Sequence, residues 1–297
     1  MPKVSIGLAV YNGEKFLCNA LDSLLSQTFS DFELILSDNA STDSTQMICE
    51  KYAKNDKRIR YFRQKNNIGM FSNVMFVLEQ AVCDYFQWAA ADDLWHPKFL
   101  EKNIHILESD DALIGSISNV GEYGEFTSDW QSIVKNISPS NLKSLNVTSI
   151  HGPYFKKVAA YLKLRQASAN YAVHRTDKLR SSISHIKGRY LWDFEIPLSV
   201  IKFGDLNVCD EVLMYKYTKG ETGNQTPLEY QMSLNLHFYE ILFPHLLFVI
   251  RCMKQFGIIV SLRNFHLILR YFAQGESQLF LDVLHIIKRK IWSRFIE

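Results

Sequence analysis

The stretch Tyr85-Phe-Gln-Trp-Ala-Ala-Ala-Asp-Asp-Leu94 is an apolar run that ends in two adjacent carboxylates. An apolar run of strand length is typical of a strand buried on both faces, as in a parallel sheet. Ligands of open α/β sheets bind where the strands end, so we expect Asp92 and Asp93 to emerge at a ligand site. Two neighbouring acids at such a place indicate a bound cation.

Similar apolar runs precede this stretch and alternate with helical patterns. Strands that alternate with helices predict a mostly parallel, doubly wound sheet with right-handed crossovers, which is a Rossmann-like α/β fold. The expected strands are 4–10, 32–37 and 59–62, and the expected helices are 14–27, 47–52 and 70–81.

The second half of the chain gives weaker signals, and residues 114–165 do not resolve into clear elements. After about residue 234 the pattern changes to helices that are dense in aromatic and aliphatic residues. We therefore predict a domain over residues 1–230 and a helical C-terminal extension over 231–297. The later expectations are a turn at 94–97, strands near 113–120, 170–174 and 206–217, a loop at 219–224, and helices at 98–107, 176–184, 190–203, 236–250, 258–272 and 279–295.

Composition limits the class of protein. A chain of 297 residues with 47% hydrophobic and 22% charged residues can bury one substantial core and carry an appendage. A formal charge of +2 gives no reason to expect a nucleic-acid partner. Five scattered cysteines without CxxC spacing argue against a disulfide framework and a zinc site, and favour a reducing compartment. No charged-then-apolar leader precedes the first strand, so we expect a cytoplasmic protein.

The C-terminal extension has two interpretations. No run reaches the roughly 18 uninterrupted apolar residues that are needed to span a bilayer. Ile286 to Phe295 mixes basic and aromatic residues, as an interfacial helix does, which would hold the protein at the cytoplasmic face of a membrane as a peripheral protein. The alternative is an ordinary helical cap with a solvated basic face.

Five short motifs follow one another along the chain, namely Pro2 to Asn12, Ser26 to Glu33, Ser37 to Asp43, Asn67 to Gly69 and Ala91 to Asp93. In this order they resemble the signature of family 2 inverting glycosyltransferases of the GT-A fold. The resemblance is strong over residues 1–110 and weak over 165–220. It implies transfer of a sugar, with inversion, from a nucleotide-diphosphate donor to an acceptor hydroxyl. The implied donor is a UDP-sugar, with a dTDP- or GDP-sugar as alternatives, and the implied acceptor is a glycan or lipid-linked acceptor in surface polysaccharide assembly.

The resemblance also implies which positions contact the donor. Tyr11 offers a ring to stack on a base, and Asp38 can accept a hydrogen bond from a pyrimidine N–H or a ribose hydroxyl. The second acid that commonly follows is Asn39 here, so the base preference stays open. Helix capping by itself would also explain the polar turn after Asp38. The implied donor-binding residues are Ala9, Tyr11, Glu14, Asp38, Asn39, Asn67, Gly69, Asn73, Ala91 and Asp92.

The metal motif departs from the family pattern, which is usually Asp-x-Asp. Ala90 stands where the first acid should be, so Asp92 and Asp93 remain as the implied metal ligands. Mg²⁺ or Mn²⁺ suits oxygen ligands and would neutralise the leaving diphosphate. The alternative is that the two acids are solvated and cap the turn before Pro97.

Inversion requires a base that removes the proton of the acceptor hydroxyl. The family supplies this base as an acid that begins a later helix. Trp192-Asp-Phe-Glu195 occupies the matching place, which makes Asp193 the candidate base and Glu195 the second candidate. Acids are also favoured in the first turn of any helix by the macrodipole, which is the alternative reading of both residues.

Two other functions remain open. A nucleotidyltransferase would share the sheet and a metal-bound nucleotide, but it needs a basic, glycine-rich loop after the first strand, which Tyr11 to Glu14 lacks. A catalytically silent protein that binds a sugar nucleotide or scaffolds an assembly remains possible because of Ala90. Release of nucleoside diphosphate separates an enzyme from a silent binder.

Overall fold

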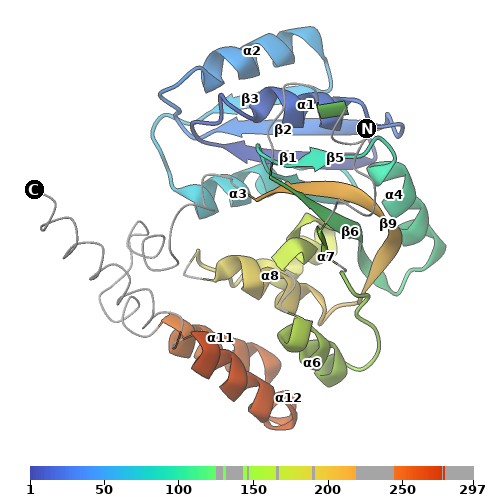
Figure 1. Cartoon of the computed structure of the whole chain (residues 1–297), viewed down its shortest axis with the longest axis vertical. Coiled ribbons are helices and arrows are strands. Elements are labelled where there is room, and N and C mark those ends of the chain that lie inside the picture. Colours follow the sequence, from blue (N-terminus) through green and yellow to red (C-terminus); the bar gives the residue numbers. More distant parts are fainter. Residues whose placement is uncertain are drawn as a thin grey trace, which may run out of the picture.

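The computed structural model describes residues 1–124, 130–131, 143–145, 147–164, 167–188, 191–218, 244–275 and 277. It contains one twisted sheet with helices on both faces, and helices α11 and α12 lie at the end of the molecule far from α2 (Figure 1). The strands are β1 (Val4–Val10), β2 (Phe32–Asp38), β3 (Ile59–Arg63), β4 (Tyr85–Ala89), β5 (Leu94–Trp95), β6 (Leu113–Tyr123), β7 (Lys143–Leu145), β8 (Val173–Arg175) and β9 (Asp205–Tyr217).

Helices surround this sheet, and they come from every part of the described chain. The segment 265–275 is also helical. The α-helices are α1 (Leu17–Leu25), α2 (Thr45–Asn55), α3 (Met70–Glu79), α4 (Phe99–Ser109), α6 (Tyr154–Leu164), α7 (Thr176–Ile183), α8 (Trp192–Val200), α11 (Pro244–Phe256) and α12 (Ile258–Arg263), and η1 (Ala167–Tyr171) is a 3₁₀ helix.

The first four long strands form a parallel sheet in the order β3-β2-β1-β4, as the alternating pattern predicts. The buried side chains of β2 alternate between its faces: Leu34 and Leu36 join the core beneath α1, α2 and α4, and Ile35 joins the core beneath α3, α7 and α8. A strand covered on both faces is apolar throughout, which explains the continuous runs in the sequence. The predicted Rossmann-like α/β fold is confirmed.

The second half of the sheet is mixed. Strand β8 is antiparallel to β4 and to β6, β9 is parallel to β6, and β5 is antiparallel to β9. The sheet is therefore less uniformly parallel than the sequence pattern suggested. Residues 206–217 belong to one long strand rather than two, and only the end of 170–174 is a strand, because η1 occupies its beginning.

The turn expected at 94–97 also differs. Leu94 and Trp95 form a short strand against Tyr215 and Met214 of β9, and both side chains are buried. A two-residue strand gives no periodic signal, so only its pairing with a distant strand reveals it. Its antiparallel pairing brings β9 against the turn that follows β4.

The C-terminal extension is helical over the described residues and packs on the rest of the chain. Arg251 Nε on α11 donates to Glu195 Oε2 of α8 at 3.0 Å, and Gln255 Nε2 donates to Ser199 Oγ of the same helix at 2.7 Å. Helix α12 lies against α6.

Within the described part of the chain, every helix is too short or too polar to cross a membrane. The proposed boundary at 230, the loop at 219–224 and the helix at 279–295 lie outside the described residues.

Candidate active site

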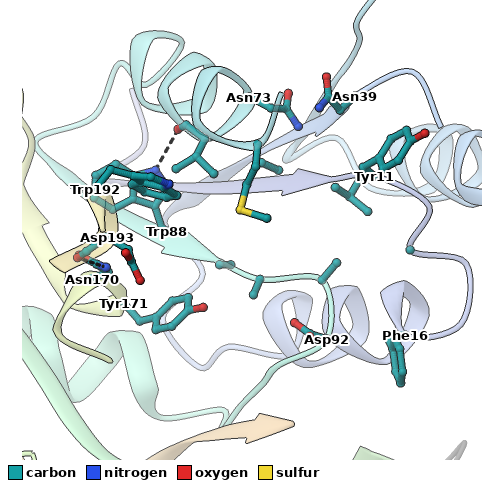
Figure 2. Close-up of a pocket in the computed structure, with 18 of the residues that line it drawn as sticks. Tyr11, Phe16, Asn39, Asn73, Trp88, Asp92, Asn170, Tyr171, Trp192 and Asp193 are labelled. Carbon is teal, nitrogen blue, oxygen red and sulfur yellow. Dashed lines mark hydrogen bonds between the residues drawn. The ribbon is translucent and has the colours of Figure 1, made fainter. Parts of the chain in front are cut away.

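A cavity of about 610 Å³ lies at the carboxyl ends of β1, β2 and β4 (Figure 2). Its opposite wall comes from η1, the start of α8, and β9. A volume of this order accommodates a ligand larger than a simple sugar. The cavity therefore lies where the sequence predicted that strands end at a ligand site. Its lining residues are Ala9, Val10, Tyr11, Gly13, Phe16, Asn39, Asn67, Met70, Asn73, Val74, Trp88, Ala89, Ala90, Ala91, Asp92, Asn170, Tyr171, Leu191, Trp192, Asp193, Ile196 and Lys216.

One end of the cavity is formed by residues that the resemblance assigned to the donor. Tyr11 is 41% exposed, so its ring is open to a ligand. Asn39 Nδ2 donates to Asn67 Oδ1 at 2.9 Å, and the Ile68 amide donates to Asn39 Oδ1 at 2.8 Å. These bonds hold the loop after β3 beside the end of β2. Asn39 thus shapes the cavity wall through its amide group.

Asn73 supports the same wall from α3. Its Nδ2 donates to the carbonyl of Ser37 at 3.0 Å, and the Ser37 hydroxyl donates back to Asn73 Oδ1 at 2.6 Å. Gln64 Nε2 donates to the same hydroxyl at 3.2 Å. Because both ends of the Asn73 amide are bonded to β2, this side chain fixes the distance between α3 and the sheet.

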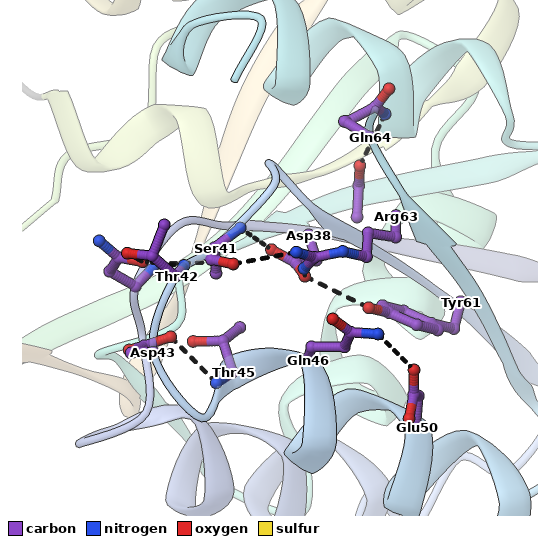
Figure 3. Close-up of polar contacts among 12 residues, drawn as sticks. Asp38, Ser41, Thr42, Asp43, Thr45, Gln46, Glu50, Tyr61, Arg63 and Gln64 are labelled. Carbon is purple, nitrogen blue, oxygen red and sulfur yellow. Dashed lines mark hydrogen bonds and ion pairs between the residues drawn. The ribbon is translucent and has the colours of Figure 1, made fainter. Parts of the chain in front are cut away.

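Asp38 is fully buried and does not line the cavity. Its carboxylate forms an ion pair with Arg63, and its Oδ1 accepts a bond from the Ser41 amide at 2.8 Å (Figure 3). The Tyr61 hydroxyl donates to its other oxygen at 3.3 Å. The side chain therefore organises the turn after β2 without capping α2, whose N-cap is Ser44, and contact with a base remains a prediction.

Glu14 and Gly69 also lie outside the cavity lining. Glu14 Oε2 accepts a bond from the Ser44 amide at 2.9 Å, which joins the loop after β1 to the start of α2. Gly69 has a φ of +85°, a left-handed conformation that a residue with a side chain rarely adopts, and it precedes the first residue of α3. Both residues support loops that border the cavity.

The two acids after β4 face different surroundings. Asp92 lines the cavity, and its carbonyl accepts a bond from the Tyr123 hydroxyl at 2.8 Å. Asp93 is only 2% exposed, and its Oδ1 accepts a bond from the Tyr217 amide at 3.0 Å. Asp93 therefore ties the turn to β9, and Asp92 is the acid that can offer an oxygen to a ligand.

The surroundings of these two acids show which protein ligands a metal ion could use. The described residues contain no group of three or more His, Cys, Asp or Glu side chains that could hold an ion. Mg²⁺ often uses one or two carboxylates and takes its remaining ligands from substrate phosphates and water. Asp92 fits a cation that a diphosphate brings with it.

Electrostatics in the cavity favour added positive charge. Burial raises the pKa of the Asp92 carboxyl, and burial together with the charge of Asp92 raises the pKa of Asp93. Lys216 on β9 acts in the opposite direction on the pKa of both acids. Lys216 is the one basic side chain among the described residues that line the cavity. Sequence reasoning missed it, although a lysine in the apolar run Leu213 to Tyr217 was a signal.

Asp193 lines the cavity from the first turn of α8. Leu191, at φ +64°, turns the chain into this helix, and Asn170 Nδ2 donates to the Asp193 carbonyl at 2.6 Å. Burial raises the pKa of the Asp193 carboxyl, and Lys216 partly opposes that shift. A carboxylate with a raised pKa is a stronger proton acceptor than an exposed one, as a general base requires.

Glu195 lies two residues further along but does not line the cavity. It is 3% exposed and paired with Arg251 of α11. Successive residues of a helix point in different directions, which separates it from Asp193. The structure thus brings Asp92, Asp193 and Lys216 to one cavity and leaves Glu195 in the packing between α8 and α11.

Two tryptophans form an apolar wall near Asp193 that the sequence did not single out. Trp88 Nε1 donates to the Val74 carbonyl at 3.0 Å, which holds the indole ring against α3. Trp192 packs edge-to-face on Phe71, with ring centroids 5.4 Å apart. In the sequence both rings are indistinguishable from ordinary core residues of a strand and a helix.

Several proteins of known sequence are similar to this chain. EpsE of Bacillus subtilis (strain 168), which bears the name of a glycosyltransferase, is 30% identical over 165 residues, or 55% of this chain. An uncharacterised glycosyltransferase of Haemophilus influenzae is 32% identical over 124 residues, or 42% of this chain. The matched regions span 59% and 37% of these two relatives.

Solved structures share the fold at low sequence identity. Residues 1–349 of TarS from S. aureus superpose with a TM-score of 0.62 at 18% identity, covering 91% of this chain and 70% of that one. A mannosyltransferase from Pyrobaculum calidifontis, solved with GDP-Man and Mn²⁺, gives a TM-score of 0.59 at 14% identity over 97% of this chain and 75% of that one.

The family model for glycosyl transferase family 2 matches residues 5–158, which is just over half of the chain and includes β1 to β6 with the turn of Asp92. The resemblance noted in the five sequence motifs is therefore confirmed. The chain belongs to glycosyl transferase family 2 and has the GT-A fold.

Proposed function

We propose that this protein transfers a sugar with inversion from a nucleoside-diphosphate donor to a hydroxyl of a glycan or lipid-linked acceptor in surface polysaccharide assembly. A UDP-sugar is the first candidate donor, and dTDP- and GDP-sugars follow. The observation that carries the proposal is that Asp92, Asp193 and Lys216 line one cavity at the strand ends. A structural neighbour, TarS, has been solved with UDP-GlcNAc and with UDP, which supports a donor of this class.

The chemistry follows from where these groups lie. The nucleotide would lie toward Tyr11 and Asn39, with its diphosphate near Asp92. Asp193, in its ionised form, accepts the proton of the acceptor hydroxyl as that oxygen attacks the anomeric carbon. Lys216 places a positive charge near the leaving diphosphate, and such preorganised charge lowers the barrier to bond cleavage.

A divalent cation, Mg²⁺ or Mn²⁺, would be held by Asp92 together with the donor phosphates. When bound, it supplies Lewis-acid charge to the leaving group. Only one acid of the metal motif, Asp92, faces the cavity, and Ala90 stands where the family pattern has another acid, which also supports a second candidate function, a silent protein that binds the donor without turnover.

The test begins with a panel of nucleotide sugars, each screened for thermal stabilisation with and without Mn²⁺, because a ligand that binds the native state raises the unfolding temperature. The stabilising donor is then assayed for release of nucleoside diphosphate. Asp92→Ala should abolish release. Tight donor binding by the unaltered protein without any release would favour the silent binder.

The candidate base has its own test. Asp193→Asn should remove transfer while donor affinity stays nearly unchanged, since the amide keeps the shape but cannot accept the proton. Asp177→Asn is the matched control, because Asp177 is also an acid in the first turn of a helix, α7, and is exposed away from the cavity. Full activity of Asp193→Asn would remove it as the base.

A further inference from the structure

The helices after residue 244 present an exposed apolar face. Ile258, Ile259 and Leu262 on α12 are 80%, 70% and 70% exposed, and Phe265 and Leu269 on the following helix are 48% and 47% exposed. Large apolar side chains gathered in this way on a surface mark an interaction site more often than isolated ones do. These five residues are called the apolar face below.

The opposite side of the same segment packs on protein. Ile258 and Leu262 are four positions apart on α12, and Phe265 and Leu269 are four positions apart on the helix that follows the turn at Asn264, so each pair lies on one side of its own helix. Leu267 and Ile268 between them are buried in the core. Asn264 Nδ2 donates to the carbonyl of Phe155 on α6 at 3.0 Å. The segment is therefore anchored on one side and open on the other.

The described helices around the apolar face are basic, and the acids Glu195 and Asp205 that meet them are already paired, with Arg251 of α11 and Lys157 of α6. Neither residues 244–275 nor α6 contains an aspartate or glutamate. The guanidinium of Arg263 lies 4.4 Å from the ring centroid of Phe155, which brings α12 and α6 side by side. The exposed basic residues of these helices are Lys156, Lys163, Lys254, Arg263 and Arg270.

This local charge contrasts with the whole chain, whose formal charge is only +2. Aliphatic side chains flanked by lysine and arginine are the pattern of an interfacial segment, in which the aliphatic groups enter the acyl boundary and the cations meet anionic headgroups. A single-stranded nucleic acid would call for several exposed aromatic rings on which successive bases stack, whereas the apolar face offers one ring, Phe265, beside four aliphatic side chains. The charge and the side-chain types together favour a lipid surface.

We propose that the apolar face and its basic neighbours dock the protein on a membrane surface that carries anionic lipids. The inference goes beyond the proposed sugar transfer and holds for any donor. It places the contact on α12 and the helix after it, in addition to the segment 286–295 that the sequence suggested. Helix α11, which precedes α12, is bonded to α8, so docking also sets the position of the cavity relative to the membrane.

The test uses the full chain, without donor, and vesicles of phosphatidylcholine alone or mixed with phosphatidylglycerol. Sedimentation should carry the protein down with the mixed vesicles only, and added salt should weaken binding because it screens the headgroup charge. Ile258→Glu combined with Leu262→Glu should abolish binding. Arg270→Gln should lower the partition coefficient by about five-fold, the effect of one cation at an anionic surface.

Matched controls lie on α2, at the other end of the molecule (Figure 1). Met47→Glu changes an apolar side chain that is 66% exposed, and Lys51→Gln removes an exposed cation. Both should bind mixed vesicles as the unaltered protein does. Equal losses in these controls would show that net charge, and not the apolar face, governs binding.

Four further results would overturn the proposal. The unaltered protein could fail to bind mixed vesicles, or the Ile258→Glu and Leu262→Glu double variant could bind them fully. Light scattering without vesicles could show that this variant dissociates an oligomer, which would mean that a second copy covers the face. Finally, Leu262→Glu could lower the unfolding temperature by several degrees, which would mean that the chain itself buries Leu262.

Discussion

Arg251→Met tests whether α11 holds α8, the helix whose first turn carries the candidate base. Arg251 Nε lies 3.0 Å from Glu195 Oε2, and the side chains are 24% and 5% exposed. Removing the cation leaves a carboxylate in a place that water hardly reaches, which costs about 3–5 kcal/mol for a fully buried pair. Because Arg251 is partly exposed, water can replace some of its contact. We expect the free energy of unfolding to fall by about 2–3 kcal/mol.

The assay is equilibrium unfolding in urea, with the slope unchanged between variants so that midpoints report stability. The control is Lys102→Met, which breaks an exposed pair of 2.9 Å with Glu211, whose side chains are 42% and 48% exposed. That change should cost less than about 1 kcal/mol.

A double variant completes the test. Glu195→Gln together with Arg251→Met should be more stable than Arg251→Met alone, because a buried neutral amide costs less than a buried unpaired charge. The reasoning is refuted if Arg251→Met loses no more stability than Lys102→Met, or if the double variant is less stable than Arg251→Met.

Three further predictions concern the cavity and the sheet. The rate of transfer should rise with pH through the pKa of Asp193, because only the ionised carboxylate accepts a proton. Burial raises that pKa, so the rise should occur above the pH range of an ordinary aspartate. A profile of initial rate against pH that rises at the ordinary aspartate pKa would contradict this. In single-turnover assays, Lys216→Met should slow release of nucleoside diphosphate by on the order of 100-fold, as loss of one preorganised charge does. An unchanged rate would show that Lys216 does not act in the reaction. Gly7→Ala should lower the free energy of unfolding by about 1–3 kcal/mol, because the added methyl would lie 2.7 Å from side-chain atoms of Phe86 and Val77, and an unchanged urea midpoint would contradict it.

The first half of the fold could be predicted from the sequence because its signals are local. Strands β1, β2 and β4 are largely apolar runs because helices cover both of their faces, whereas the edge strand β3 carries two arginines and is partly exposed. In the helices between these strands, apolar residues recur every three or four positions, because one side of each helix is buried. Connections between parallel strands through a helix are right-handed, which restricts the order in which these strands can be arranged.

The second half could not be predicted in the same way because its pairings are long-range. Leu94 and Trp95 become a strand through contact with β9, more than a hundred residues later. The long strand β9 shifts register against β6 at several points, so its side chains do not alternate cleanly in the sequence.

The sequence by itself determined the fold family and a short set of acids in which the candidate site had to be sought, because the motifs and the apolar runs are properties of neighbouring residues. Only the tertiary structure decided which of these acids face the cavity. Asp92 faces it, whereas Asp93 is bonded to the amide of Tyr217. Lys216 lies near Asp92 because β9 pairs with β5, the strand that directly follows the turn of Asp92, and α8 brings Asp193 to the same cavity. A side chain's direction depends on what packs against its backbone, and in this chain those partners lie far away in the sequence.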